Sequence, residues 1–99
     1  MQAHIPINRE RLIAFCQQHH IRRLALFGSV LTDRFTADSD VDVLVEFEPG
    51  SRVGLFDIAR MEQELTDLMG READLRTPAD LSPYFREDVL KHAKVQYAA

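Results

Sequence analysis

Hydrophobic and polar residues alternate most clearly in the middle of this chain. Between residues 40 and 47 every second position is apolar, namely Val41, Val43, Val45 and Phe47. A period of two is typical of a strand that buries one face, because successive side chains of a strand point to opposite sides. Two further short segments, at 22–27 and 72–76, end at Gly28 and at Thr77-Pro78, which interrupt a strand. We therefore predict three strands, at 22–27, 40–47 and 72–76.

The longer segments outside these strands have helical spacing. A first helix is expected over residues 9–19, capped by Asn8, with a buried face of Leu12, Ile13, Phe15 and Cys16. A second helix is expected over residues 55–69 and ends at Gly70, with an apolar stripe of Leu55, Ile58, Ala59, Leu65 and Met69.

Two shorter helices complete the predicted order of elements. One or two helical turns are expected at 30–34, and a last helix at 83–93 begins with Ser82-Pro83 and points Phe85, Val89 and Ala93 inward. Residues 95–97 are expected to form a brief extended tail. The order helix, strand, short helix, strand, helix, strand, helix predicts an α/β (α+β) fold. In it a small mixed three-stranded sheet is flanked by about four helices, in one domain over residues 1–99.

Composition narrows the class of protein. With 45% hydrophobic residues the chain is expected to fold around a core rather than to remain disordered. The net charge of −4, with no basic run longer than Arg22-Arg23, argues against binding a nucleic-acid backbone. Cys16 is the only cysteine, so a disulfide framework and a Cys-based zinc site are excluded. The lack of a long apolar segment favours a cytoplasmic protein without a membrane span. A domain this small is also compatible with a homo-oligomer or a partner chain.

Candidate chemistry is concentrated around residues 28–42. Asp40 and Asp42 are two residues apart on the predicted strand, so both carboxylates are expected on one face, where they repel each other. A divalent cation would relieve this repulsion, and carboxylate oxygens favour Mg²⁺, or Mn²⁺, over zinc. Gly28-Ser29 lets the backbone approach a ligand closely, and the short helix after it would aim N–H groups at a phosphate. Together these residues predict a nucleoside-triphosphate site.

A third carboxylate is expected from the last strand. Asp74 lies between Ala73 and Leu75, so a sheet can present it beside the other two aspartates. Three carboxylates can hold a two-metal centre for in-line displacement at phosphorus. Each part has a simpler interpretation when taken alone, since Gly-Ser is often an ordinary turn and Asp74 could be a solvated strand residue. Asp42 is harder to explain that way, because aspartate is disfavoured inside a β-branched run.

These residues resemble the minimal nucleotidyltransferases of the DNA polymerase β-like superfamily. That family has Gly-Ser, ten residues, then Asp-x-Asp, as in Gly28, Ser29, Asp40 and Asp42, with a later acidic residue matched by Asp74. The resemblance implies Mg²⁺-dependent transfer of AMP from ATP to a hydroxyl. It also implies that the three aspartates hold the metals and that Gly28 and Ser29 hold phosphates. Members resembling the MntA antitoxins modify a tyrosine of a partner HEPN-type helical toxin.

One departure from the family pattern leaves a second function open. Many members carry a basic residue three positions after the serine, where this chain has Thr32, and Arg34 is the candidate substitute. The alternative is a non-catalytic or weakly catalytic antitoxin that neutralises its partner by contact. Transfer to a small molecule or to an RNA 3′ end is a further possibility, with RNA disfavoured by the acidic net charge.

Overall fold

The computed structural model of this protein describes residues 7–36 and 38–99. In chain order its elements are α1 (Arg9–Gln18), β1 (Ile21–Phe27), the 3₁₀ helix η1 (Gly28–Leu31), β2 (Val41–Phe47), α2 (Leu55–Met69), β3 (Ala73–Arg76), the 3₁₀ helix η2 (Pro78–Asp80), α3 (Arg86–His92) and β4 (Lys94–Ala98). The order of elements is the predicted one up to β3, and η2 and β4 are additional.

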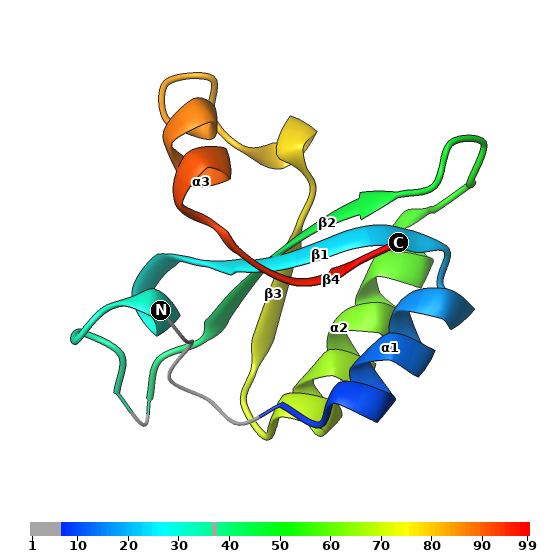
Figure 1. Cartoon of the computed structure of the whole chain (residues 1–99), viewed down its shortest axis with the longest axis horizontal. Helices are drawn as coiled ribbons and strands as arrows, with labels where there is room; N and C mark the ends of the chain where they lie inside the picture. The colour runs from blue at the N-terminus through cyan, green and yellow to red at the C-terminus, as the bar shows by residue number, and fades with distance from the viewer. Residues whose placement is uncertain (1–6, 37) are drawn as a thin grey trace.

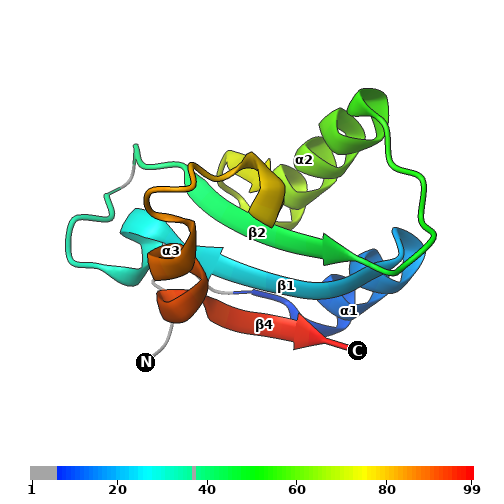
Figure 2. The same ribbon diagram turned by 90° about the horizontal axis from the view of Figure 1, so that it is seen from above.

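The strands form one mixed sheet in the order β3-β2-β1-β4. β1 is antiparallel to both β2 and β4, whereas β2 and β3 are parallel and are connected through α2. Figures 1 and 2 show α1 and α2 side by side on one face of the sheet and α3 on the other side. The sheet is four-stranded, so the predicted count of three was wrong. The expected tail at 95–97 is a strand, because it pairs with β1 along the edge away from β2.

The helices also differ from the prediction in number and extent. The described residues form three α-helices and two 3₁₀ helices in place of about four helices. The short helix expected at 30–34 is η1, which begins at Gly28 itself. The last helix begins at Arg86 rather than at residue 83, and Phe85, expected inside, is 52% exposed. In contrast, Asn8 caps α1 through Arg11 N–H, and Gly70 ends α2 in the left-handed conformation, both as predicted.

The core lies between the sheet and the pair α1 and α2. Its fully buried members include Leu12, Cys16, Leu24, Val43 and Leu65. Three side chains expected there are exposed instead: Ile13, Leu55 and Ala59. The buried stripe of α2 runs through Met61, Leu65 and Met69 at intervals of four, and helical geometry turns residues 55 and 59 away from it. α2 has only 15 residues, and no helix in the described ranges could cross a membrane.

Candidate active site

Two carboxylates meet at the end of the sheet where β2 and β3 begin. Val41 and Val43 are buried towards the helices, so Asp42 between them points to the opposite face of the sheet. The parallel register pairs Asp42 with Asp74, which places these residues side by side on neighbouring strands. The hydrogen bond from Val41 N–H to the Glu72 carbonyl, 2.8 Å long, fixes this register at its start. The structure therefore brings together the two carboxylates that the sequence places 32 residues apart.

Asp40 lies just outside the sheet. β2 begins at Val41, so the predicted start of this strand was one residue early, and Asp40 is the exposed last residue of the preceding loop. That loop is held by the Arg71 guanidinium, which donates a 2.7 Å hydrogen bond to the Thr36 carbonyl and lies over the Phe35 ring. The loop thus keeps Asp40 beside Asp42. The negative charge of Asp40 raises the pKa of Asp42.

Gly28 faces the Asp42 carboxylate from the neighbouring strand. Phe27, the last residue of β1, pairs with Asp42, and Gly28 follows with a φ of +80°. A Cβ built on Gly28 would overlap Asp42 Oδ2. Any side chain at this position would displace the carboxylate, and the positive φ adds backbone strain for any other residue. The glycine therefore allows the turn to lie directly against the acidic end of the sheet.

A hollow of about 380 Å³ adjoins this turn and is lined by Gly28, Ser29, Thr32 and Arg34. Thr32 donates a 2.9 Å hydrogen bond from its hydroxyl to the Ser29 carbonyl, and its Oγ1 accepts a 3.2 Å bond from the Arg34 N–H. Thr32 thus shapes the turn, and Arg34 brings the positive charge to the same hollow. η1 has only four residues, so the dipole expected of the predicted helix contributes little here.

The electrostatics of the site centre on Asp42. Burial raises the pKa of Asp42, and the negative charge of Asp74 raises it further. The positive charge of Arg76 opposes this rise, and Asp40 adds a smaller one. Negative charges gathered in a half-buried place are costly, and they are most stable when a cation lies among them.

The carboxylates of the site are suitable ligands for a hard divalent cation, but they do not form a closed metal cage. Among residues 7–36 and 38–99, no group of three or more His, Cys, Asp and Glu side chains converges to hold a metal ion. Asp42 and Asp74 supply adjacent carboxylates, and their like-charge repulsion is the feature that Mg²⁺ or Mn²⁺ would relieve. The residues therefore fit such an ion, and the three-aspartate centre stays a prediction.

Sequence reasoning did not identify Glu62, Arg71 and Arg76, which all support or adjoin the site. Glu62 of α2 accepts a 2.7 Å hydrogen bond from the Leu75 N–H on the outer edge of β3, and thereby holds the strand that carries Asp74. These residues carry no local motif. Only the i, i+2 spacing of Asp74 and Arg76 on a strand could have shown that they share a face.

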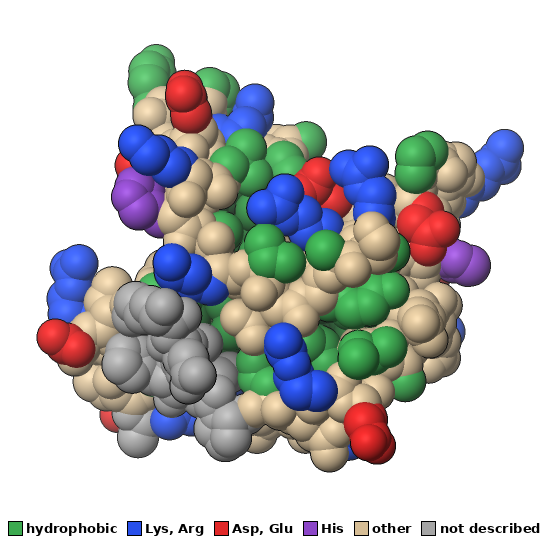
Figure 3. Space-filling model, viewed as in Figure 1, with side chains coloured by type: hydrophobic (Ala, Val, Ile, Leu, Met, Phe, Trp, Pro, Cys, Tyr) green, Lys and Arg blue, Asp and Glu red, His purple; other side chains and the backbone are tan. Residues whose placement is uncertain are grey.

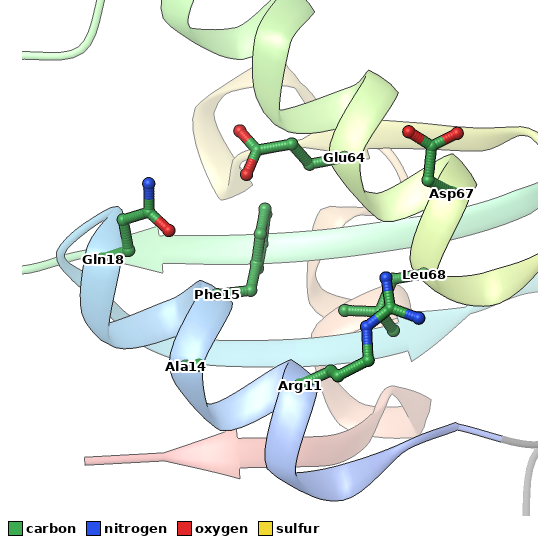
Figure 4. A pocket seen from close by; sticks show the side chains of 7 residues that line it. All are labelled: Arg11, Ala14, Phe15, Gln18, Glu64, Asp67 and Leu68. Carbon is green, nitrogen blue, oxygen red and sulfur yellow. The ribbon is translucent and has the colours of Figure 1, made fainter.

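A separate hollow of about 290 Å³ lies between α1 and α2, on the opposite side of the sheet (Figure 4). It is lined by Arg11, Ala14, Phe15, Gln18, Glu64, Asp67 and Leu68. Its polar residues come from the outward faces of two packed helices, and Glu64 is 3.1 Å from His19 Nε2. This hollow is a groove between helices and contains none of the predicted site residues.

A mixed sheet with paired carboxylates at one end indicates a class of enzymes, those that use acidic residues to transfer nucleotides. The chain belongs to the nucleotidyltransferase domain family, whose model matches residues 9–95. The resemblance to the nucleotidyltransferases is thereby confirmed, and the protein is an enzyme of the nucleotidyltransferase class.

Relatives of similar size support this membership. The chain is 31% identical over 85 residues to "Putative protein adenylyltransferase MJ0435" of Methanocaldococcus jannaschii, covering 86% of this chain and 89% of the relative. It is 32% identical over 71 residues to the protein adenylyltransferase MntA of Thermococcus cleftensis, covering 72% of this chain and 70% of the relative. A solved "putative minimal nucleotidyltransferase" superposes with a TM-score of 0.70 at 39% identity, covering 86% of this chain and 85% of that one.

Two more distant structures share the fold. A toxin–antitoxin complex with AMP-PNP has a TM-score of 0.73 at 18% identity, covering 94% of this chain and 75% of that chain. A tri-AMPylated Shewanella oneidensis HEPN toxin in complex with an MNT antitoxin gives 0.65 at 17% identity, covering 92% and 70%. At these identities the likeness concerns the fold.

Proposed function

We propose that this protein transfers AMP from ATP to a hydroxyl of a partner protein, a tyrosine of a HEPN-type toxin, and so acts as an antitoxin. The observation that carries the proposal is the register that pairs Asp42 with Asp74, directly beside Gly28. Relatives named as protein adenylyltransferases at 31% and 32% identity support a protein acceptor. The likeness in fold to toxin–antitoxin complexes supports a toxin as the partner.

In this proposal the two parts of the site have different roles. Gly28, Ser29 and Arg34 line the hollow next to the carboxylates and bind the β- and γ-phosphates of ATP. The α-phosphorus then lies near Asp42 and Asp74. Asp40, Asp42 and Asp74 would hold Mg²⁺, which would supply charge stabilisation at the α-phosphate and the leaving oxygen.

The chemical step is an in-line substitution at the α-phosphorus. Asp74 accepts the proton of the acceptor hydroxyl, whose oxygen forms a new bond to the α-phosphorus. The bond from that phosphorus to the bridging oxygen breaks, and pyrophosphate leaves with the electron pair. The products are the AMP-modified protein and pyrophosphate, so atoms and charge balance.

The test is incubation of the protein with α-labelled ATP, Mg²⁺ and a HEPN-type toxin, the partner named in the proposal. We expect label on the partner with the wild type and at least a ~100-fold lower rate with Asp42→Ala, because the carboxylate contributes to transition-state stabilisation. Asp33→Ala is the matched control, since this exposed aspartate lies in the same loop region outside the carboxylate pair. Equal labelling by Asp42→Ala and wild type would contradict the proposal.

A contact antitoxin is the second candidate function. It is favoured by Thr32 in place of a basic residue and by the lack of a preformed three-ligand cage in the described residues. The double variant Asp40→Ala/Asp42→Ala separates the two candidates in a toxicity assay with the partner. Full neutralisation by this variant supports contact, whereas retained binding without neutralisation supports transfer of AMP.

A further inference from the structure

Arg76 shares the face of the sheet on which the carboxylates lie. Ala73 and Leu75 of β3 are buried towards the helices, with 2% and 3% exposure, so Asp74 and Arg76 point the other way. The register with β2 places Asp74 beside Asp42 and Arg76 beside Leu44. Arg76 is therefore the next side chain after Asp74 along this face, about 7 Å further along the strand.

The Arg76 guanidinium acts electrostatically on the site without forming an ion pair. Its positive charge opposes the effects of burial and of Asp74 on the pKa of Asp42, and its influence exceeds that of Asp40. Within the described ranges it lies within 4.0 Å of no carboxylate, and its one hydrogen bond runs 3.1 Å from Nη1 to the Leu75 carbonyl. A guanidinium has five N–H donors, so most remain available to a ligand.

Arg34 and Arg76 lie on opposite sides of the carboxylates. The sheet order β3-β2-β1 puts Asp42 in the middle strand, with the hollow of Gly28 and Arg34 towards β1 and Arg76 on β3. Phosphates held in that hollow approach from the β1 side. Because an in-line reaction needs the acceptor opposite the leaving pyrophosphate, the acceptor approaches from the β3 side, where Arg76 is.

We propose that Arg76 selects and positions the acceptor by binding an acidic group next to the modified hydroxyl. This inference rests on the proposed function. A guanidinium forms paired hydrogen bonds with a carboxylate, which fix orientation as well as charge. The preferred acceptor is therefore a polypeptide segment that carries aspartate or glutamate beside the hydroxyl residue. A lysine-rich segment is rejected by charge repulsion.

The probe is a pair of matched synthetic peptides in which one tyrosine is flanked by glutamates or by lysines. With labelled ATP and Mg²⁺ we expect the wild type to label the acidic peptide at least ~10-fold faster. Arg76→Gln should remove this preference by raising the KM for the acidic peptide, and Arg76→Lys should restore part of it. The affinity for ATP, measured by calorimetry, should stay within about twofold in both variants. Arg60→Gln, an exposed arginine of α2, is the control that keeps the preference.

The outcomes separate this inference from the proposed function. An unchanged peptide preference in Arg76→Gln would overturn the acceptor role, as would a loss of ATP affinity as large as that of Arg34→Gln. If the wild type binds ATP but labels neither peptide nor a HEPN-type toxin, the proposed function fails and the role of Arg76 fails with it.

Discussion

At the scale of single residues, the site depends on a glycine as much as on its carboxylates. Gly28 has positive φ and leaves no room for a Cβ next to Asp42 Oδ2. Gly50 has almost the same backbone conformation, with a φ of +86°, but a Cβ there would meet nothing within 4 Å. The two glycines therefore allow the backbone requirement to be separated from the steric one.

We predict that Gly28→Ala destabilises the protein by about 1–3 kcal/mol and abolishes nucleotide transfer, because the methyl group displaces the Asp42 carboxylate. Gly50→Ala should carry only the cost of the positive φ, about 1 kcal/mol, with transfer unchanged. Urea denaturation and the labelled-ATP assay measure the two effects. Equal loss of activity in both variants would show that the contact with Asp42 is unimportant.

Cys16 offers a prediction about pH. Burial raises the pKa of its thiol from 9.0 to about 12, so the folded protein keeps the proton over a range in which the unfolded chain loses it. Stability is therefore full below pH 9 and decreases as the pH rises from 9 towards 12. We expect Cys16→Ala to weaken this decrease in thermal unfolding scans at high pH. We also expect the native thiol to react with a thiol reagent only after unfolding. Fast reaction in the folded state would contradict the burial.

At the scale of elements, the sequence predicted what depends on local periodicity. The limits of α2 were predicted correctly, and Val41, Val43 and Val45 of β2 are buried as the alternation predicted, although Leu44 is also buried on the opposite face. The extended tail expected at 95–97 was not predicted to join the sheet, because β4 forms only by pairing with β1, which lies about 70 residues earlier. Phe85 was expected inside since the spacing fits a helix, but α3 begins after it. The carboxylate pair followed from the motif, whereas Arg76 depended on a register that no local pattern encodes.

The hydrogen bonds between α2 and β3 lead to a prediction at this scale. β3 is an edge strand, and its outer N–H groups bond to side chains of α2: Leu75 N–H to Glu62 at 2.7 Å and Ala73 N–H to Thr66 at 3.1 Å. Glu62→Ala leaves the Leu75 N–H without this acceptor, so we expect a loss of about 1–3 kcal/mol and slower transfer, because Asp74 lies on the same strand.

Glu62→Gln tests the cause, since its side-chain oxygen can still accept the bond and should retain most of the stability. Gln63→Ala, on the exposed side of α2, is the control expected to change stability by less than about 0.5 kcal/mol. A loss in Glu62→Gln as large as in Glu62→Ala would show that the charge, rather than the hydrogen bond, supports β3.

At the scale of the whole molecule, stability and surface are unevenly distributed. On the face shown in Figure 3, Lys and Arg side chains are interspersed with acidic ones. The main core cluster packs on the α1–α2 side of the sheet, whereas the carboxylates occupy the other side, which they share with the buried Leu44. Substitutions in this core cluster therefore act at a distance from the carboxylates, whereas those at Gly28 and Glu62 affect stability and transfer together.

Helix α2 has both an exposed and a buried hydrophobic side chain, and the two can be compared. Phe56 is 91% exposed and Met61, five residues later, is 1% exposed. We predict that Phe56→Ser changes the free energy of unfolding by no more than about 0.5 kcal/mol, whereas Met61→Ala lowers it by about 2–5 kcal/mol. Chemical denaturation of both variants tests this, and a large loss in Phe56→Ser would place that side chain in a buried contact.

The register between β2 and β3 also limits how the protein can change by insertion and deletion. Side chains of a strand alternate between faces, so adding one residue within β3 would exchange the faces of Asp74 and Leu75. A carboxylate would then enter the core while a leucine took its place at the site. Within this strand, insertions or deletions are thus tolerated only when they involve an even number of residues. In related domains we therefore expect changes in the number of residues before Asp74 to lie in the turn after Gly70. Side chains in that turn do not alternate between the core and the site.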